Sequence, residues 1–426
     1  MKRNILIIGA GGVAQVVAHK CAQNNALLGN IHIASRTLHK CEAIIDSIRE
    51  KGSLQRPGRL QAHALDAMDI AATRFLIRAT HSQIVINAGS PFLNMSVLAA
   101  CIETGAAYLD TAIHEDPAKV CETPPWYANY EWKRRGACKD AGVTAVLGVG
   151  FDPGVVNAYA RYAIDNCFDR VDSIDINAGS HGRYFATNFD PEINFREFVS
   201  TVWSWEKGAW KANRMFEHRK VWDMPVTGPS TTYLTGHDEL HSMSQTLGVP
   251  DIRFWMGFSE HYINVFTVLK NLGLLSEQPV RTARGQEIVP LEVVKAVLPD
   301  PASLAPGYTG KTCIGDLVRG VRDGQPEEVL IYNVCDHEAC FEEVGSQAIS
   351  YTAGVPAVAA AMLIANGTWD RREMVNVEEL DPVPFIALMN RMGLVTRIRD
   401  AEGDRVLRLE REVGGKVEVG MRANAW

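Results

Sequence analysis

The sequence predicts an α/β protein whose first domain is a Rossmann fold, a doubly wound parallel sheet with helices on both faces. Two observations predict it. Up to about Gly150, short runs of apolar and β-branched residues alternate with amphipathic stretches. A glycine-rich turn, Gly9-Ala10-Gly11-Gly12-Val13-Ala14, follows the first of these runs directly and opens the first amphipathic stretch. Such alternation is typical of parallel sheets, because each parallel pair of strands needs a crossover that is usually a helix.

Six short apolar runs are predicted as the strands of this sheet. They cover residues 4–8, 31–35, 60–64, 84–88, 107–110 and 144–149. Helices are predicted between them at residues 11–24, 38–48, 95–104 and 131–141, with another that begins after Asp66. The strand order expected for this fold is 3-2-1-4-5-6.

Residues at the predicted helix ends support these boundaries. Thr37 precedes the helix at 38–48, and a threonine hydroxyl can accept a hydrogen bond from a free amide at a helix start. Gly105 follows the helix at 95–104 and tolerates the left-handed conformation that commonly ends a helix. Asp66 either caps the helix that follows it or contacts the adenine of a bound dinucleotide, and capping is the safer interpretation.

The pattern changes after Phe151-Asp152-Pro153-Gly154, where short runs rich in tryptophan and glycine replace the regular alternation. This change predicts a second, α+β domain. The small, apolar stretch at 347–365 favours a helix that packs back on the first domain. We therefore expect a Rossmann domain at 1–152, a substrate-binding domain at 153–345 and a C-terminal segment at 346–426 that returns to the Rossmann domain.

The composition excludes several classes of function. The formal net charge of -7 and a pI near 6.0 argue against a nucleic-acid binder, which usually carries a basic excess. No apolar run approaches the roughly 20 residues that span a bilayer, so no membrane association is expected. The apolar run at the N-terminus is too short for a signal peptide, and nine scattered cysteines suit a reducing compartment. We therefore expect a cytoplasmic protein.

One cysteine cluster resembles a metal site. It is Cys335-Asp336-His337-Glu338-Ala339-Cys340. A zinc site usually needs a second pair of ligands, and no other segment has the matching spacing. We therefore expect no metal.

The glycine-rich turn predicts a dinucleotide site. Gly9 permits the tight turn, Gly11 lets the backbone approach the pyrophosphate, and Ala14 allows close packing of the helix. The helix predicted at 11–24, with Gly12 and Val13 in its first turn, offers free amides and the positive end of its dipole to the phosphates. The motif is specific here because it follows a strand and opens a helix.

The end of the second strand predicts NADP(H) rather than NAD(H). NAD sites place an acid there to bind the ribose 2′-hydroxyl, but this chain has Ser35-Arg36-Thr37. Arg36 can pair with a 2′-phosphate that a carboxylate would repel, and the two hydroxyls can donate hydrogen bonds to it. The alternative is that Arg36 is a solvated surface arginine. At the end of the fourth strand, Asn87-Ala88-Gly89-Ser90-Pro91 is expected to border the ribose and nicotinamide, with Asn87, Ala88, Gly89 and Pro91 as contacts.

The chain resembles the saccharopine dehydrogenase-like family in motifs that are spread over nearly its whole length. Many families share the glycine turn, but the later motifs are far more specific because no general requirement of the fold dictates them. These motifs are Gly150-Phe151-Asp152-Pro153-Gly154, Asn177-Ala178-Gly179-Ser180-His181-Gly182, Ala186-Thr187-Asn188-Phe189-Asp190-Pro191-Glu192, Phe254-Trp255-Met256-Gly257-Phe258, Leu304-Ala305-Pro306-Gly307-Tyr308-Thr309-Gly310 and Asp336-His337-Glu338.

The resemblance implies a homodimeric, NADP(H)-dependent oxidoreductase whose second domain mediates dimerisation. The branch of the family that it matches best implies reductive condensation of aspartate β-semialdehyde with a diamine, either putrescine or 1,3-diaminopropane. The product would be carboxyspermidine or carboxynorspermidine, in bacterial polyamine synthesis.

That reaction needs a group that moves protons while water leaves. The candidates are Asp110, Asp152, His181 and His237. Asp110 and Asp152 lie at the carboxyl ends of the fifth and sixth strands, at the edge where ligands bind in this fold, and His181 lies between glycines in an expected loop. For each of them a structural role remains an alternative. Asp110 is ranked last because it can hold its own turn together.

The reaction also needs a cation for the carboxylate of the semialdehyde and an anion for the far ammonium of the diamine. Candidate cations are Arg183, Arg196 and Lys311, and candidate anions are Glu192, Asp238 and Glu239. Asn188 lies in a motif shared with the family and is included as a substrate contact. The tryptophans of this region either line the pocket or pack in the core.

Two other functions remain open. One is saccharopine dehydrogenase activity itself, which joins an amino acid and an oxo-acid and would need a further basic contact. The other is a non-enzymatic NADP(H) sensor, which predicts no convergent acid–base groups. Asp110, Asp152 and His181 argue against the sensor.

Overall fold

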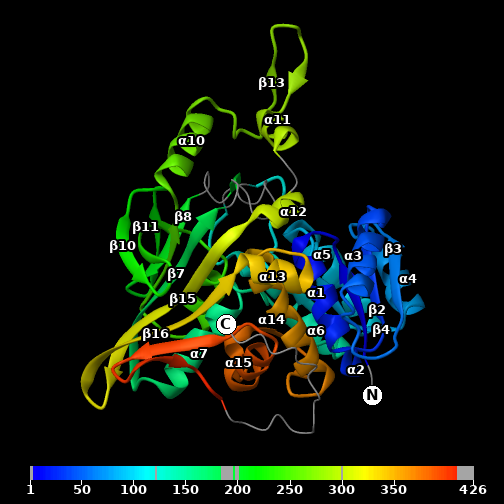
Figure 1. Cartoon of the computed structure of the whole chain (residues 1–426). Helices are drawn as coiled ribbons and strands as arrows, with labels where there is room; N and C mark the ends of the chain where they lie inside the picture. Colours follow the sequence, from blue (N-terminus) through cyan, green and yellow to red (C-terminus); the bar gives the residue numbers. More distant parts are fainter. Residues whose placement is uncertain (1–2, 120–121, 184–194, 197–200, 299–300, 410–426) are drawn as a thin grey trace.

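The computed structural model describes residues 3–119, 122–183, 195–196, 201–298 and 301–409 (Figure 1). Its first domain holds a parallel sheet in the order β17-β6-β5-β4-β1-β2-β3. The strands are β1 Asn4–Ile8, β2 Ile31–Ser35, β3 Leu60–Ala64, β4 Ser82–Asn87, β5 Ala107–Asp110, β6 Ala145–Leu147 and β17 Met374–Asn376. The predicted order 3-2-1-4-5-6 is therefore confirmed, and β17 adds a seventh strand that pairs with β6.

Helices cover both faces of this sheet. They are α1 Gly12–Gln23, α2 Asn25–Leu28, α3 Leu38–Glu50, α4 Ile70–Ala79, α5 Asn94–Thr104 and α6 Arg135–Ala141, with short 3-10 turns at Pro91–Leu93, Trp126–Ala128 and Glu131–Arg134. Alternate side chains of β1 point to opposite faces. Ile5 and Ile7 pack with the side of α1 and α3, whereas Leu6 and Ile8 pack with the side of α4 and α5.

Two predicted capping contacts are absent. Asp69, not Asp66, caps α4, because its Oδ1 accepts a hydrogen bond of 3.0 Å from the amide of Ala72. Asp66 instead accepts from the amide of Met68 at 3.0 Å, which closes a local turn. Thr37 does precede α3, but its side chain makes no capping hydrogen bond. Gly105 ends α5 in the left-handed conformation, as predicted, with φ of 73°.

The second domain holds a mixed sheet of ten strands in the order β10-β11-β12-β7-β15-β16-β18-β19, with β8 and β9 attached through β12. Its strands are β7 Arg170–Arg183, β8 Val202–Glu206, β9 Ala209–Asn213, β10 Arg219–Met224, β11 Gly228–Thr235, β12 Asp251–Gly257, β15 Thr309–Arg322, β16 Gln325–Asp336, β18 Thr396–Asp400 and β19 Gly403–Val406. The expected mixed α+β second domain is thus confirmed.

The remaining helices of the described chain surround this sheet or link it to the first domain. They are α7 Val155–Asn166, α9 Leu240–Thr246, α10 Glu260–Asn271, α11 Pro290–Val297, α12 Pro301–Leu304, α13 His337–Val344, α14 Ala348–Ala365 and α15 Pro382–Arg391, with 3-10 turns at Ala305–Gly307 and Val377–Glu379. The short hairpin of β13 Val280–Arg281 and β14 Glu287–Ile288 projects beside α10 and α11 (Figure 1).

The prediction that His181 lies in a loop is wrong, because β7 continues through Arg183. His181 pairs with Lys311 of β15, and the register runs on to the pair Arg183 and Thr309. The flanking glycines do not interrupt the strand, since Gly182 pairs directly with Gly310. The backbone hydrogen bonds of the long β7–β15 ladder therefore override the turn preference of single glycines.

The chain after Gln347 contributes to both domains. Helix α14 packs against α1 so closely that a Cβ atom on Gly354 would lie 2.8 Å from Cβ of Val16. Strand β17 joins the first sheet, while β18 and β19 extend the second. In the described part of the chain, α14 alone is long and apolar enough to span a membrane, with mean hydropathy 1.7. Since 83% of it is buried, it has the character of a core helix between the two domains.

Candidate active site

A cleft of about 1380 Å³ lies between the two domains. Its lining comes from the glycine turn, from the ends of β2 and β4, from the turn after β6, and from the start of α14. The second domain contributes residues of β7, β12 and β15 and the segment that joins β11 to α9. The carboxyl edge of the parallel sheet thus opens into this cleft, as expected for ligand sites of doubly wound sheets.

The glycine turn has the geometry of a phosphate site. Gly9 has φ of +113°, and a Cβ atom on it would lie 2.8 Å from the carbonyl oxygen of Ala88. Gly11 directly precedes α1, and a Cβ atom there would meet no atom within 4 Å. The amides at the start of α1 therefore face open space in the cleft, which a pyrophosphate fits. Gly12 and Val13 also line the cleft.

The end of β2 carries two cations rather than one. Ser35, Arg36 and Thr37 line the cleft as predicted, and so does Lys40, which the sequence analysis missed. Lys40 lies in the first turn of α3, four residues after Arg36, and the side chains of both residues line the cleft. The hydroxyl of Ser35 donates to the carbonyl of Thr37 at 3.1 Å, so it also fixes this turn.

The residues at the end of β4 form part of the cleft wall, and Asn87 supports them from behind. Ala88, Gly89 and Pro91 line the cleft. Asn87 lies behind them, where its Nδ2 donates to Asn94 at 2.8 Å and its Oδ1 accepts from the amide of Gly89 at 3.2 Å. Asn87 therefore shapes the turn that faces the cleft. Asp66 also lines the cleft, beside the end of β3.

Three polar residues face the cleft near the turn after β6: Asp152, His237 and Asp238. Burial, together with the negative charges of Glu239 and Asp238, raises the pKa of Asp152 to about 7, against the opposing effect of His237. Burial likewise raises the pKa of Asp238 to about 6, although its Oδ2 accepts a 2.7 Å hydrogen bond from the amide of Ile113. Both carboxyl groups therefore titrate close to neutral pH, which suits proton transfer.

Two further acids lie behind this lining. Glu239 is fully buried and its Oε2 lies 2.6 Å from Nδ1 of His237. Asp316 of β15 is also fully buried, and neither of its carboxyl oxygens has a hydrogen-bond partner within the described residues. Burial, with the charges of Glu239 and Asp152, raises the pKa of Asp316 well above its ordinary value. Asp316 was not predicted as a site residue, because its only signal in the sequence is an acid within an apolar strand, at Ile314-Gly315-Asp316-Leu317-Val318.

Asp110 lies at the same sheet edge but not in the lining of the cleft. It is fully buried, its Oδ1 accepts a 2.5 Å hydrogen bond from the amide of Gly148, and its carbonyl oxygen accepts from Val149. Burial raises the pKa of Asp110 to about 7. Its contacts hold the turn that leads to Asp152. The backbone of His181 lies in β7, two residues beyond the cleft-lining Gly179, and its side chain falls outside the described atoms.

The predicted substrate contacts are placed as follows. Asn188 and Glu192 lie outside the described residues, and Arg183 is described only by its backbone at the end of β7. Lys311 lies outside the cleft lining and its Nζ is 3.4 Å from Asp336. Arg196 lines the cleft, but its guanidinium is buried against Glu115, Glu277 and the carbonyl oxygens of Asp116, Pro117 and Lys119. Arg196 therefore joins the two domains.

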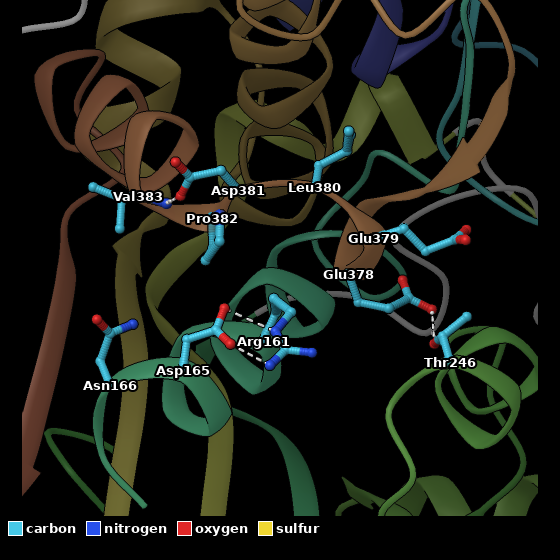
Figure 2. Close-up of a pocket in the computed structure, with 10 residues that line it drawn as sticks. All are labelled: Arg161, Asp165, Asn166, Thr246, Glu378, Glu379, Leu380, Asp381, Pro382 and Val383. Carbon is cyan, nitrogen blue, oxygen red and sulfur yellow. Dashed lines mark hydrogen bonds and ion pairs between the residues drawn. The ribbon is translucent and has the colours of Figure 1, made fainter.

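A second pocket, of about 630 Å³, lies between α7 and the start of α15 (Figure 2). Figure 2 shows Asp165 paired with Arg161, and Glu378 pointing toward Thr246. The hydroxyl of Thr246 donates to Glu378 at 2.9 Å. The other oxygen of Glu378 accepts from Asn157 at 2.9 Å, and Asn157 in turn accepts from the amide of Gly154 at 2.8 Å. This pocket therefore borders the buried hydrogen bonds that hold the turn containing Asp152.

The cysteine cluster forms no metal centre in the described part of the chain, where no group of three or more potential ligands is arranged to hold an ion. The sulfur atoms of Cys335 and Cys340 lie 3.2 Å apart and both residues are buried. The imidazole Nδ1 of His337 faces the amide of Ala348 at 3.2 Å, so it joins α13 to α14.

Two family models match the chain. One, described as the saccharopine dehydrogenase NADP binding domain, matches residues 5–146, and the other, the saccharopine dehydrogenase C-terminal domain, matches residues 150–394. The first spans the glycine turn and Arg36, and the second spans Asp152, His237 and Asp316.

Several relatives match nearly the whole chain. A carboxynorspermidine synthase of Vibrio alginolyticus is 46% identical over 93% of this chain and 97% of its own length. A carboxyaminopropylagmatine dehydrogenase of Synechocystis is 42% identical over 92% of this chain and 96% of its own. Among solved structures, the apo saccharopine dehydrogenase (L-Glu forming) of Saccharomyces cerevisiae aligns with a TM-score of 0.68 at 14% identity, over 94% of this chain and 100% of that one.

Proposed function

The chain belongs to the saccharopine dehydrogenase family, as its motifs predicted, and is an NADP(H)-dependent oxidoreductase; from this premise we propose that it makes a polyamine precursor. The reaction is the reductive condensation of aspartate β-semialdehyde with an aliphatic amine that carries a second cationic group. With putrescine or 1,3-diaminopropane the product is carboxyspermidine or carboxynorspermidine. The chain then acts as a cytoplasmic homodimer, which light scattering and cell fractionation test.

The cofactor fits the sheet edge. The open space at Gly11 accommodates the pyrophosphate, and Arg36 with Lys40 accommodates a 2′-phosphate. Ala88, Gly89 and Pro91 border the nicotinamide side of the same groove. When bound, the cofactor supplies the hydride that reduces the imine. The protein's own contribution is to hold the two substrates, exclude water and move protons.

The observation that carries the choice of substrate is the excess of acids around Asp152. Asp152 and Asp238 face the cleft, with Glu239 and Asp316 buried behind them. Such a cluster favours an amine with a second positive charge, which stabilises the ionised carboxylates, over an amine that also brings a carboxylate. In saccharopine-type chemistry both partners carry carboxylates, whereas in the proposed condensation only the semialdehyde does. Apart from Arg36 and Lys40, the arginine or lysine in the described cleft lining is Arg196. Its guanidinium is already paired with Glu115 and Glu277.

Proton transfer falls to Asp152. The attacking ammonium must lose a proton, and the departing hydroxyl must gain one before water leaves. A carboxyl group with a pKa of about 7 can do both at neutral pH. Its position at the carboxyl edge of the sheet, in the same cleft as the glycine turn, supports this role.

The amine substrate is either a short diamine or a longer amine that carries a guanidinium group. Two relatives with similar sequence identity to this chain are named for carboxynorspermidine and for carboxyaminopropylagmatine. The test is NADPH oxidation with aspartate semialdehyde and, in turn, 1,3-diaminopropane, putrescine, agmatine or butylamine. Lysine with 2-oxoglutarate is the saccharopine-type control. We expect oxidation with one of the first three amines and little with butylamine. Oxidation only with lysine and 2-oxoglutarate would contradict the proposal.

A further inference from the structure

His237 and Glu239 form a fixed pair beside Asp152. They lie in the short connection between β11 and α9, and His237 Nδ1 is 2.6 Å from Glu239 Oε2. The side chain of His237 is 11% exposed and lines the cleft, whereas that of Glu239 is fully buried. Because the two nitrogens point to opposite sides of an imidazole ring, Nδ1 facing Glu239 directs Nε2 away from this carboxylate.

The imidazole ring cannot turn freely in this position. It stacks on Phe254 of β12, with ring centroids 4.0 Å apart and planes 15° from parallel. Stacking on one side and the Glu239 bond at Nδ1 together set one ring orientation. This is the arrangement in which a carboxylate fixes the tautomer of a histidine that acts as an acid–base group.

A purely structural role for Glu239 is less consistent with its contacts. Glu239 occupies the N-cap position of α9, yet its side chain makes no capping hydrogen bond there. Its second oxygen, Oε1, has no hydrogen-bond partner among the described residues. A buried carboxylate that neither caps its helix nor satisfies both oxygens is costly, and such costs cluster at functional sites.

The groups around the pair are mostly acidic. Asp152 faces it from the turn after β6, Asp316 from β15 and Asp238 from its own connection, and His241 lies one turn further in α9. Asp152 and His237 both line the cleft, so a substrate nitrogen and oxygen can reach two different proton-transfer groups.

We propose that His237, held by Glu239, is a second catalytic acid–base group, and that it works with Asp152 during the loss of water in the proposed condensation. This inference rests on the proposed function. In this scheme Glu239 is a positioning residue, since it acts through His237.

The proton transfers of the condensation can be divided between two such groups. One takes a proton from the substrate ammonium, and the neutral nitrogen then forms the new bond to the aldehyde carbon while the C=O π pair moves to oxygen. The added nitrogen now holds one proton too many and the oxygen one too few. The second group gives a proton to this oxygen and then takes the extra proton from the added nitrogen, which leaves a neutral carbinolamine. The stored proton then goes to the hydroxyl, which leaves as water and gives a protonated imine. No net proton is consumed, so His237 and Asp152 end in the states in which they began.

The test compares His237→Ala with His261→Gln in the full-length enzyme. His261 is a matched control because it is an exposed imidazole that lines the same cleft from α10. We expect His237→Ala to lower kcat about 100- to 10,000-fold, the usual range for acid–base groups, and to leave the dissociation constant of NADPH within about twofold. His261→Gln should keep kcat within about threefold of wild type.

Chemical rescue separates catalysis from folding. Added imidazole should raise the kcat of His237→Ala at least about tenfold, because imidazole can occupy the space left beside Phe254 and carry the proton. The restored rate should depend on the pKa across a series of substituted imidazoles. Glu239→Gln should lower kcat at least about tenfold without NADPH loss, since it removes the carboxylate that orients the ring.

The outcomes are distinct. If wild type oxidises NADPH with none of the amines, the proposed function fails. If wild type is active and His237→Ala keeps kcat within threefold, the function stands and the role of His237 is overturned. If His237→Ala is folded and inactive but no imidazole restores turnover, the role of His237 is also overturned.

Discussion

A Cβ atom on Gly12 would lie 2.5 Å from Oγ of Ser350, because the start of α14 crosses the start of α1 at that point. The neighbouring Ser346 donates a hydrogen bond of 3.3 Å to the carbonyl of Gly12. Residues that are more than 330 positions apart in the chain thus build one wall of the cofactor groove. The C-terminal segment therefore forms part of the cleft wall beside the glycine turn.

This contact separates the roles of two adjacent glycines. Gly12→Ala should destabilise the protein, because its methyl group overlaps Ser350 and also lies 3.1 Å from Oγ of Ser346. Overpacking of this kind costs about 1–3 kcal/mol. Gly11→Ala meets no atom within 4 Å, so its stability should be near that of wild type, while the methyl group obstructs the space for the pyrophosphate. Thermal unfolding and NADPH fluorescence titration measure the two effects.

A second substitution checks the steric cause. Ser350→Gly in the Gly12→Ala background removes both the Oγ at 2.5 Å and the Cβ at 3.3 Å, so it should recover part of the lost stability. No recovery, or an unfolding temperature of Gly11→Ala as low as that of Gly12→Ala, would contradict the assignment.

The cation pair at the end of β2 predicts the cofactor preference. Arg36→Ala should weaken NADPH binding at least tenfold, because a charged hydrogen bond contributes about 1.5–3 kcal/mol, and should leave NADH binding nearly unchanged. Lys40→Ala should have the same sign and a smaller effect, since an ammonium binds phosphate as a point charge without the fork of a guanidinium.

Arg59→Ala is the matched control, because Arg59 is an exposed arginine of the same domain outside the cleft lining. It should change neither dissociation constant. Equal losses of NADPH and NADH affinity in Arg36→Ala would show that Arg36 supports the turn and does not bind the 2′-phosphate.

The fold of the first domain followed from local patterns. Each strand is a short apolar run, and the glycine turn marks where the first strand ends, so order and handedness follow from general rules. β17 was not predicted, because a three-residue strand at the sheet edge leaves almost no periodic signal. The extension of β7 through His181 was missed for a related reason, since its pairing with β15 joins segments more than 120 residues apart.

The site was predictable where function depends on the backbone and poorly predictable where it depends on side-chain burial. The glycines and Arg36 sit in a fixed sequence context. Asp110 and Asp152 look alike in sequence, since each follows a strand, but only Asp152 reaches the cleft lining. Asp316 gave no usable signal because its role depends on what lies across the sheet from it.

The difference between Asp110 and Asp152 predicts opposite behaviour of two conservative variants. Asp152→Asn should lower turnover about 100- to 10,000-fold, because it removes a proton-transfer group, while NADPH affinity and stability hold. Asp110→Asn should keep most of the turnover, since an amide oxygen can still accept the hydrogen bond from Gly148. Asp110→Ala should be destabilising, because the buried amide of Gly148 loses that partner.

Steady-state kinetics and thermal unfolding of all three variants distinguish the roles. If Asp110→Asn loses as much turnover as Asp152→Asn at unchanged stability, Asp110 also takes part in proton transfer. Near-wild-type turnover of Asp152→Asn between pH 6 and 9 would remove Asp152 from the mechanism.

The buried acids predict an unusual pH dependence of stability. The pKa of Asp316 is raised in the folded protein, and those of Asp110 and Asp152 reach about 7. Between the unfolded value near 4 and these folded values, the folded state binds more protons than the unfolded state, so stability falls as pH rises through this range. Asp316→Asn removes one such group. It should therefore raise the unfolding temperature relative to wild type at pH 8, with a smaller gain at pH 5.

Asp175 of β7 provides the matched control with the opposite sign. It is as buried as Asp316 but its oxygens accept hydrogen bonds from Arg253, Trp255 and Arg319. Burial alone would raise the pKa of Asp175, but the Arg253 hydrogen bond and the charge of Lys220 lower it overall. Its stabilising contribution is present above the unfolded pKa and is lost as pH falls, so Asp175→Asn should lower the unfolding temperature more at pH 8 than at pH 4. If Asp316→Asn destabilises at pH 8 as Asp175→Asn does, the carboxylate of Asp316 has a stabilising cationic partner, and its pKa is not raised.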